Sequence, residues 1–284
     1  MEWLQYVTLG FAPGLFWWAW LRCKDRYEPE PLHLVARAFV LGALTPALVL
    51  AVRPTLEALL PVEFTTRRLL LDAFLVTALV EEAVKLCAMV LAIGRHRELD
   101  EPLDGVVYGG AAALGFASIE TVLFVAAHQA PALALQRGFT TGLVHLACSG
   151  AIGWQVARLR LRCDLREFAR LLLVGMASVA LHGTYDALLL SERGLVALLL
   201  VLPVTLAAFG ALVRHASHES RERMAAGRAS RAARAPQHLA HSNSKVIAST
   251  EAAASATAIS VTPVASELVR AVAPVGSTAK RVMR

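Results

Sequence analysis

The feature that most constrains this chain is a group of three ionisable residues inside a long apolar segment. Residues 69–93 are mostly Leu, Val, Ala and Phe, yet Glu81, Glu82 and Lys85 lie near the middle of the segment. A helix of about 20 residues is long enough to cross a bilayer, and a charge at its centre costs roughly 3 kcal/mol on insertion scales. We therefore expect these side chains to face a protein interior or a wet cavity, which makes them candidates for function.

The composition indicates an all-α, polytopic membrane protein. Of the 284 residues, 56% are hydrophobic, and the mean hydropathy is +0.54, which is too high for a soluble domain. The apolar residues gather in separate stretches of spanning length, which predicts a bundle of about seven transmembrane helices. These stretches are approximately 4–21, 33–52, 69–93, 104–127, 138–157, 169–190 and 194–213.

The distribution of Lys and Arg between the stretches predicts the orientation. Ten basic residues fall in the first, third and fifth connections, whereas five fall in the alternate ones, and eleven more follow residue 213. Because cytoplasmic loops carry the excess of positive charge, we expect the N-terminus outside and the C-terminus in the cytoplasm. The protein is expected to be a multi-pass membrane protein.

A change in composition after residue 213 predicts two parts, a transmembrane domain at 1–213 and a tail at 214–284. The tail is rich in Ala and Ser, basic and almost free of aromatic residues, which is typical of a disordered cytoplasmic extension. Its basic strip, Arg214–Arg234, is suited to contact anionic lipid. Positive-inside topology already explains these arginines, so we expect the lipid bilayer and not a nucleic acid as the partner.

Four further polar residues are predicted to share the depth of Glu81 and Glu82. With the topology above, Glu120, His145, His182 and Asp186 all fall between the midplane and the outer face. His182 and Asp186 are one turn apart on one helix face, as are Glu81 and Lys85. Imidazoles and carboxylates at one level suit acid–base chemistry and a catalytic zinc ion with an open position for water.

Each of these groups, considered alone, can also have a structural role in place of a functional one. Glu81 and Lys85 can be an ion pair that neutralises a buried carboxylate, and His145 can be a core histidine. A proton- or ion-coupled transporter would also collect carboxylates at the midplane, although two symmetric halves or broken helices would be expected there. The common depth of all the groups favours a joint functional site.

Four short motifs follow one another along the predicted spans. They are EExxK at Glu81–Lys85, FxxxE at Phe116–Glu120, the isolated His145, and HxxxD at His182–Asp186. The first loop adds Asp25–Pro31, which reads DxxEPEP. This ordered set resembles the PrsW family of intramembrane proteases, relatives of the CAAX prenyl protease and bacteriocin-processing group. Thr121 departs from the pattern, because Asn is expected after the motif glutamate.

The resemblance implies cleavage of a peptide bond of a membrane-anchored protein near the outer half of the bilayer, classically in a single-span anti-sigma factor. It implies that Glu81 or Glu82 is the base and that Lys85 keeps a motif glutamate ionised. It also implies that Glu120, His145 and His182 bind a metal or stabilise the transition state, and that Asp186 orients His182. The alternatives are a non-proteolytic transporter or scaffold, and a CAAX-type or bacteriocin-like peptide processor.

Overall fold

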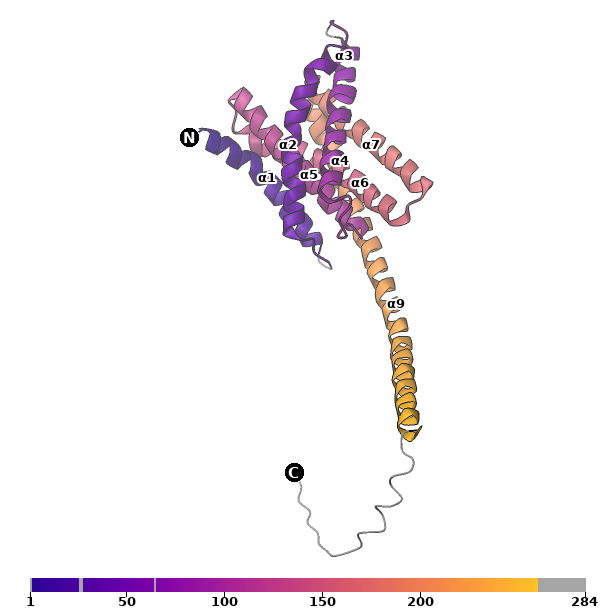
Figure 1. The fold of residues 1–284 in the computed structure, drawn as a ribbon. Coiled ribbons are helices and arrows are strands. Elements are labelled where there is room, and N and C mark those ends of the chain that lie inside the picture. Colours follow the sequence, from indigo (N-terminus) through magenta and orange to yellow (C-terminus); the bar gives the residue numbers. More distant parts are fainter. Residues whose placement is uncertain (1, 26–27, 64, 260–284) are drawn as a thin grey trace, which may run out of the picture. The chain divides into compact units, whose positions relative to one another are not determined.

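The computed structural model describes residues 2–25, 28–63 and 65–259, and every regular element in these ranges is helical. Figure 1 shows the arrangement of the helices. The elements are α1 (Glu2–Lys24), α2 (Leu32–Glu57), α3 (Thr66–Leu71), η1 (Asp72–Ala78), α4 (Leu79–Ile93), α5 (Pro102–His128), α6 (Leu133–Arg162), α7 (Leu165–Leu190), α8 (Gly194–Val196), η2 (Ala197–Val201) and α9 (Leu202–Ile259).

The all-α class predicted from the sequence is confirmed, and each predicted apolar stretch lies within helical elements. Four segments of the described chain are long and apolar enough to cross a membrane: Leu32–Glu57, Pro102–His128, Leu165–Leu190 and Gly194–Ala229. The total of about seven crossings therefore stays a prediction.

The helical run that carries Glu81 and Glu82 is not a uniform α-helix. Its first part, α3, is followed by the π-helical turns of η1, and α4 begins at Leu79, two residues before Glu81. Short π-helical turns are rare and are often found at functional sites. Here the π-helical turns end at Ala78, three residues before Glu81.

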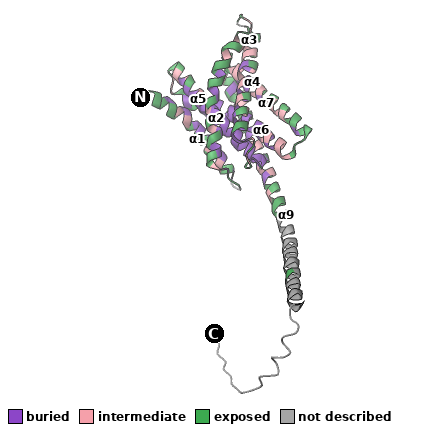
Figure 2. Cartoon of the chain, in the orientation of Figure 1, coloured by how far each residue is buried: buried purple, intermediate pink, exposed green. Residues whose placement is uncertain are grey.

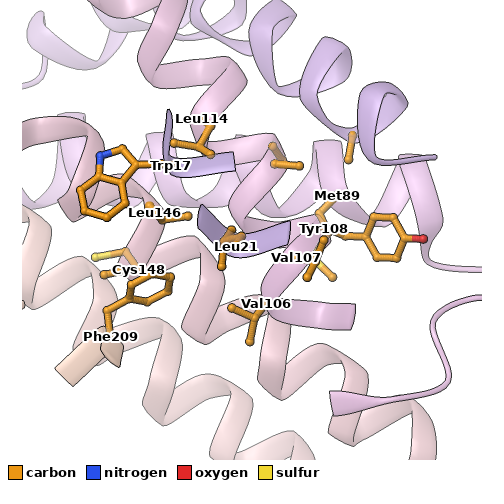
Figure 3. Packing of buried hydrophobic residues seen from close by; sticks show 14 of the residues in the cluster. Trp17, Leu21, Met89, Val106, Val107, Tyr108, Leu114, Leu146, Cys148 and Phe209 are labelled. Atoms are coloured by element: carbon orange, nitrogen blue, oxygen red, sulfur yellow. The ribbon is translucent and has the colours of Figure 1, made fainter. Parts of the chain in front are cut away.

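Helix α5 is the centre of the bundle and packs against α1, α2, α4 and α6. Every residue from Pro102 to Ser118 is buried, which Figure 2 shows as a purple stretch. Tyr108 and Leu114 of this helix belong to a continuous apolar cluster with Leu146 of α6 and Phe209 of α9 (Figure 3). A helix buried on all sides cannot be placed by amphipathic periodicity, because it has no polar face.

Glycines allow α5 to approach its neighbours at backbone distance. A Cβ atom placed at Gly105 would lie 2.1 Å from the carbonyl oxygen of Gly153 in α6, and one placed at Gly153 would lie 2.0 Å from that of Gly105. A Cβ atom at Gly42 of α2 would lie 2.0 Å from the carbonyl oxygen of Ala112. Small residues at these crossings bring the helices close enough for short polar side chains to meet.

We expect Gly105→Ala to destabilise the protein by about 1–3 kcal/mol, because the added methyl group forces α5 and α6 apart. The matched control is Gly175→Ala in α7, where no atom lies within 4 Å of an added Cβ atom. Thermal unfolding in detergent measures the stability of both variants. An equal effect of the two substitutions would contradict close packing of α5 on α6.

The predicted boundary at residue 213 is not marked by a break in the helix, since α9 runs from Leu202 to Ile259. Contacts divide the chain into one unit at Met1–Met224 and another at Ala225–Arg284, and the functional division predicted at residue 213 stays a prediction. The disorder predicted for 214–284 is not confirmed, because the described backbone is helical to Ile259. Residues 260–284 of that tail lie outside the described residues.

Candidate active site

The structure brings together all seven ionisable residues that the sequence singled out. Helix α4 provides three of them, α5 and α6 provide one each, and α7 provides two. The side chains of the group are buried or partly buried, with Lys85, His145 and His182 at most 1% exposed. The seven residues are Glu81, Glu82, Lys85, Glu120, His145, His182 and Asp186.

Glu82 uses both carboxylate oxygens to hold its neighbours. Its Oε1 accepts a hydrogen bond from Lys85 Nζ at 2.7 Å and lies 3.0 Å from His182 Nδ1. Its Oε2 accepts a hydrogen bond from Ser149 Oγ at 2.9 Å. Both oxygens of Glu82 therefore have partners, and these contacts fix the positions of Lys85 and His182.

His145 is fixed in a similar way by Glu120. His145 Nε2 lies 3.0 Å from Glu120 Oε2, while Glu120 Oε1 accepts a hydrogen bond of 2.8 Å from Arg137. The ring of Phe116 packs edge-on against His145, with the ring centroids 5.3 Å apart. A carboxylate on one ring nitrogen leaves the opposite nitrogen, Nδ1, directed toward the middle of the cluster.

Gly183 allows α7 to bring His182 close to the helix that carries the glutamates. A Cβ atom at Gly183 would lie 2.6 Å from the ring of Phe74 in η1. With α7 this close, His182 Nε2 faces Glu81 Oε2 at 3.7 Å and Asp186 Oδ2 at 3.2 Å. The two histidine rings meet at nearly a right angle, with the centroids 4.8 Å apart.

Three donor atoms converge at the centre of the cluster, one each from Glu81, His145 and His182. Within the described part of the chain these residues form the group that could hold a metal ion, with ligand atoms within 4.8 Å of one another. Glu81 Oε2 is buried and has no hydrogen-bond partner. One carboxylate and two imidazoles, each imidazole with a carboxylate on its other nitrogen, are typical of a protein metal site.

Lys85 lies beside the same centre. Its Nζ is 2.8 Å from His145 Nδ1 and 3.7 Å from Glu81 Oε2, and it lies 4.5 Å from the centroid of Phe116. The ammonium group therefore competes with any metal for the lone pair of His145 Nδ1. Lys85 Nζ also donates a hydrogen bond of 2.7 Å to Glu82 Oε1, so it keeps a partner that does not involve His145.

A cavity of about 550 Å³ opens onto the cluster from the side of Glu120 and Asp186. Asp186 Oδ2 is buried and, like Glu81 Oε2, makes no well-aligned hydrogen bond, although it lies 3.2 Å from His182 Nε2. Arg137 also lines the cavity, and its Nε–H has no partner either. The other lining residues are Arg53, Thr77, Phe124, Leu133, Gln136, Thr140, Thr141, Tyr185, Leu189 and Leu190. The cavity therefore reaches two carboxylates of the cluster, those of Glu120 and Asp186.

The DxxEPEP loop packs against the opposite end of α5 from Glu120. Glu30 accepts a hydrogen bond from Tyr108 Oη, and its backbone N–H donates to Asp25 Oδ2 at 3.0 Å. Arg26 and Tyr27 of this motif lie outside the described residues. Burial, together with the nearby charges of Asp25 and Glu98, raises the pKa of Glu30 from 4.5 to about 7, although hydrogen bonds from Asp104 and Tyr108 lower it. This loop therefore anchors α5 and does not contribute side chains to the ionisable cluster.

The raised pKa of Glu30 predicts a fall in stability as the pH rises. Between pH 4.5 and about 7 the unfolded chain ionises this group while the folded protein keeps it protonated, so the folded state binds more protons. We therefore expect the melting temperature to decrease across this range and the contribution of Glu30 to level off above it. Glu30→Gln should flatten the profile, measured by thermal unfolding, whereas an unchanged slope would contradict this account.

Sequence reasoning missed three residues that position the site: Ser149, Arg137 and Gly183. Arg137 was counted only as a loop charge, and Ser149 carries no motif. The helical spacing could have indicated Ser149, because this residue follows His145 by four positions and therefore lies on the same helix face. Gly183, next to the motif histidine, is a small residue of the kind that permits close helix packing.

The fold and this site define a class of protein: a helical membrane peptidase with a buried centre of carboxylates and imidazoles. Comparison with known proteins supports the class. Residues 30–212 match the PrsW family of intramembrane metalloproteases. The chain is 28% identical over 187 residues to Protease PrsW of Bacillus subtilis (strain 168), covering 64% of this chain and 82% of that protein.

Two further relatives carry the same name. Protease PrsW of Geobacillus kaustophilus (strain HTA426) is 32% identical over 187 residues, covering 66% of this chain and 80% of that protein. Protease PrsW of Clostridioides difficile (strain 630) is 28% identical over 206 residues, covering 71% of this chain and 86% of that protein. No solved structure matches the chain. The chain belongs to the PrsW family of intramembrane metalloproteases, and it is a membrane peptidase.

Proposed function

We propose that the protein hydrolyses a peptide bond of a membrane-anchored protein in the outer half of the bilayer, at the cluster around Glu81. The observation that carries this proposal is the convergence of Glu81 Oε2, His145 Nδ1 and His182 Nε2 in a buried space beside a cavity. Glu81 Oε2 lacks a hydrogen-bond partner there. A buried carboxylate oxygen that accepts no hydrogen bond is costly, even with Lys85 Nζ at 3.7 Å, so a ligand or a reaction is its best explanation.

We assign the metal to Glu81, His145 and His182, and propose that it is zinc, which suits a carboxylate and two imidazoles. When bound, a metal would lower the pKa of a water molecule and polarise the substrate carbonyl. This ligand set differs from the one predicted from the sequence, in which Glu120 took the place of Glu81. Glu120 is occupied by His145 and Arg137, so its role in the proposal is to orient His145.

The remaining residues provide the proton transfers and the electrostatic support. Asp186, which lines the cavity and whose Oδ2 lies 3.2 Å from His182 Nε2, accepts the proton of the attacking water and returns it to the leaving nitrogen as the peptide bond breaks. Arg137 Nε–H donates to the oxyanion that develops on the carbonyl oxygen. Glu82 orients His182, and Lys85 balances the charge of Glu82.

The cavity and the distribution of basic residues support a substrate and an orientation of the chain in the membrane. We propose that the substrate is a single-span membrane protein, such as an anti-sigma factor, whose extended segment enters through the 550 Å³ cavity. The excess of basic residues in alternate connections supports an N-terminus outside and a C-terminus in the cytoplasm of a bacterial plasma membrane. The cavity lies at the end of α5 that this orientation directs outward.

A comparison of cleaved membrane proteins identifies the substrate and tests the proposed function. Membranes from cells expressing the wild-type chain or Glu81→Gln are compared for new protein N-termini by mass spectrometry. We expect cleavage sites in the outer half of single-span proteins that disappear in the Glu81→Gln sample. Identical sets of N-termini in the two samples would contradict the proposed function.

A further inference from the structure

A second cavity, of about 620 Å³, lies between the end of α1 and the part of α9 around residues 210–221. It is separate from the proposed catalytic cluster, with which it shares no lining residue. All of its lining residues belong to the unit Met1–Met224. They are Trp20, Cys23, Lys24, Gly210, Val213, Arg214, Ser217, His218 and Arg221.

The lining of this basic cavity carries positive charge and no carboxylate. Lys24 and Arg214 enter it from different helices, and Arg221 joins them one turn beyond Ser217. Of the nearby carboxylates, Glu219 is directed elsewhere, since it accepts hydrogen bonds from Arg158 and Trp154. Glu222 lies 3.6 Å from His218, which lines the cavity, so Lys24 and Arg214 outnumber this one carboxylate. The cavity is therefore suited to an anion.

The shape of the cavity depends on Gly210. A Cβ atom at Gly210 would lie 3.5 Å from Arg214 Nη1, so the guanidinium group lies over a residue that has no side chain. Lys24 Nζ lies 5.2 Å from the centroid of the Trp20 ring, which places a second cation at the opposite wall. Two cations with an open space between them, and a serine hydroxyl beside them, match the needs of a phosphate group.

The cavity also lies where the apolar surface of the bundle ends. On α9, Val204 and Leu206 are at least 50% exposed, whereas the exposed residues from Arg221 onward include Arg223 and Arg228. Leu15 and Phe16 give α1 a similar exposed apolar surface before Lys24. Trp20, at the change from apolar to basic, is typical of a membrane interface. An occupant at this level can have an acyl chain along the apolar surface and a charged headgroup in the cavity.

We propose that this cavity binds the phosphate headgroup of an anionic phospholipid from the leaflet that α1 and α9 reach here. Basic pockets between membrane helices are suited to such headgroups. A lipid bound here would hold Arg214, the first residue of the basic strip, close to α1. The proposal does not depend on the catalytic assignment, since it involves none of those residues.

The test uses the full chain purified in detergent and probed with phosphatidylglycerol or phosphatidylcholine by native mass spectrometry. We expect bound phosphatidylglycerol to exceed phosphatidylcholine at equal concentration. Lys24→Gln combined with Arg214→Gln should weaken phosphatidylglycerol binding about tenfold or more, because each basic residue near a headgroup contributes to it. Gly210→Leu, which fills the space without changing the charge, should weaken it as well.

The matched control is Arg95→Gln combined with Arg97→Gln, an equal loss of charge at two residues that do not line the cavity. This control should retain binding. Equal weakening by the two charge variants, or no preference for phosphatidylglycerol, would overturn the proposal. Displacement of the lipid by millimolar inorganic phosphate would also overturn it, since the occupant would then be a soluble phosphate.

Discussion

Glu81→Gln is expected to lower the rate of substrate cleavage by about 10³-fold. The substitution keeps the size of the side chain but removes the carboxylate whose Oε2 has no partner and faces both histidines. General acid–base groups contribute about 10²- to 10⁴-fold to catalysis, and loss of a metal ligand has an effect of similar size. The rate is measured in liposomes with the substrate that N-terminal sequencing identifies.

Two comparisons separate catalysis from folding. Glu222→Gln removes a carboxylate that lies 3.6 Å from His218, outside both the cluster and its cavity, and should leave the rate unchanged. Glu82→Gln should lower the rate and the melting temperature together, because Glu82 holds Lys85, His182 and Ser149. Cleavage at the wild-type rate by Glu81→Gln would contradict the assignment of Glu81 to the active site.

Lys85→Met is expected to reduce the free energy of unfolding by about 3–5 kcal/mol, because it leaves the buried charge of Glu82 without its ammonium partner. Lys85 is completely buried, so water cannot replace the lost partner. For a chain of this size, a change of that magnitude lowers the melting temperature by about 10 °C.

A double-mutant cycle identifies the cause. Adding Glu82→Gln to Lys85→Met removes the unpaired charge, so the double variant should be more stable than the sum of the two single effects predicts. Thermal unfolding in detergent provides all four values. Strict additivity would show that the buried ion pair does not account for the role of Lys85.

The sequence contained enough information to predict the helical class and the group of seven ionisable residues. The cost of burying Glu81, Glu82 and Lys85 in an apolar segment indicated a shared interior, and the structure joins them to both histidines. Helical spacing alone predicted the contact between His182 and Asp186, which the structure places at 3.2 Å.

The role of each residue in the group could not be predicted, because it depends on contacts between side chains of different helices. Sequence left open which of Glu81 and Glu82 has a catalytic role, whereas the structure shows that both oxygens of Glu82 are occupied. The pairing of Glu120 with Arg137 is likewise a contact between α5 and α6. The π-helical turns of η1 also have no simple sequence signal, because their residues are as apolar as those of α4.

The central claim is that Glu81, His145 and His182 bind the metal, and the metal content of the purified protein tests it most directly. The measurement distinguishes this ligand set from the one predicted from the sequence, in which Glu120 took the place of Glu81. We expect about one zinc ion per wild-type chain and substantial loss from Glu81→Gln, His145→Ala and His182→Ala. Glu120→Gln should retain most of the metal, since Glu120 only orients His145. Full zinc content in Glu81→Gln together with loss from Glu120→Gln would contradict the account.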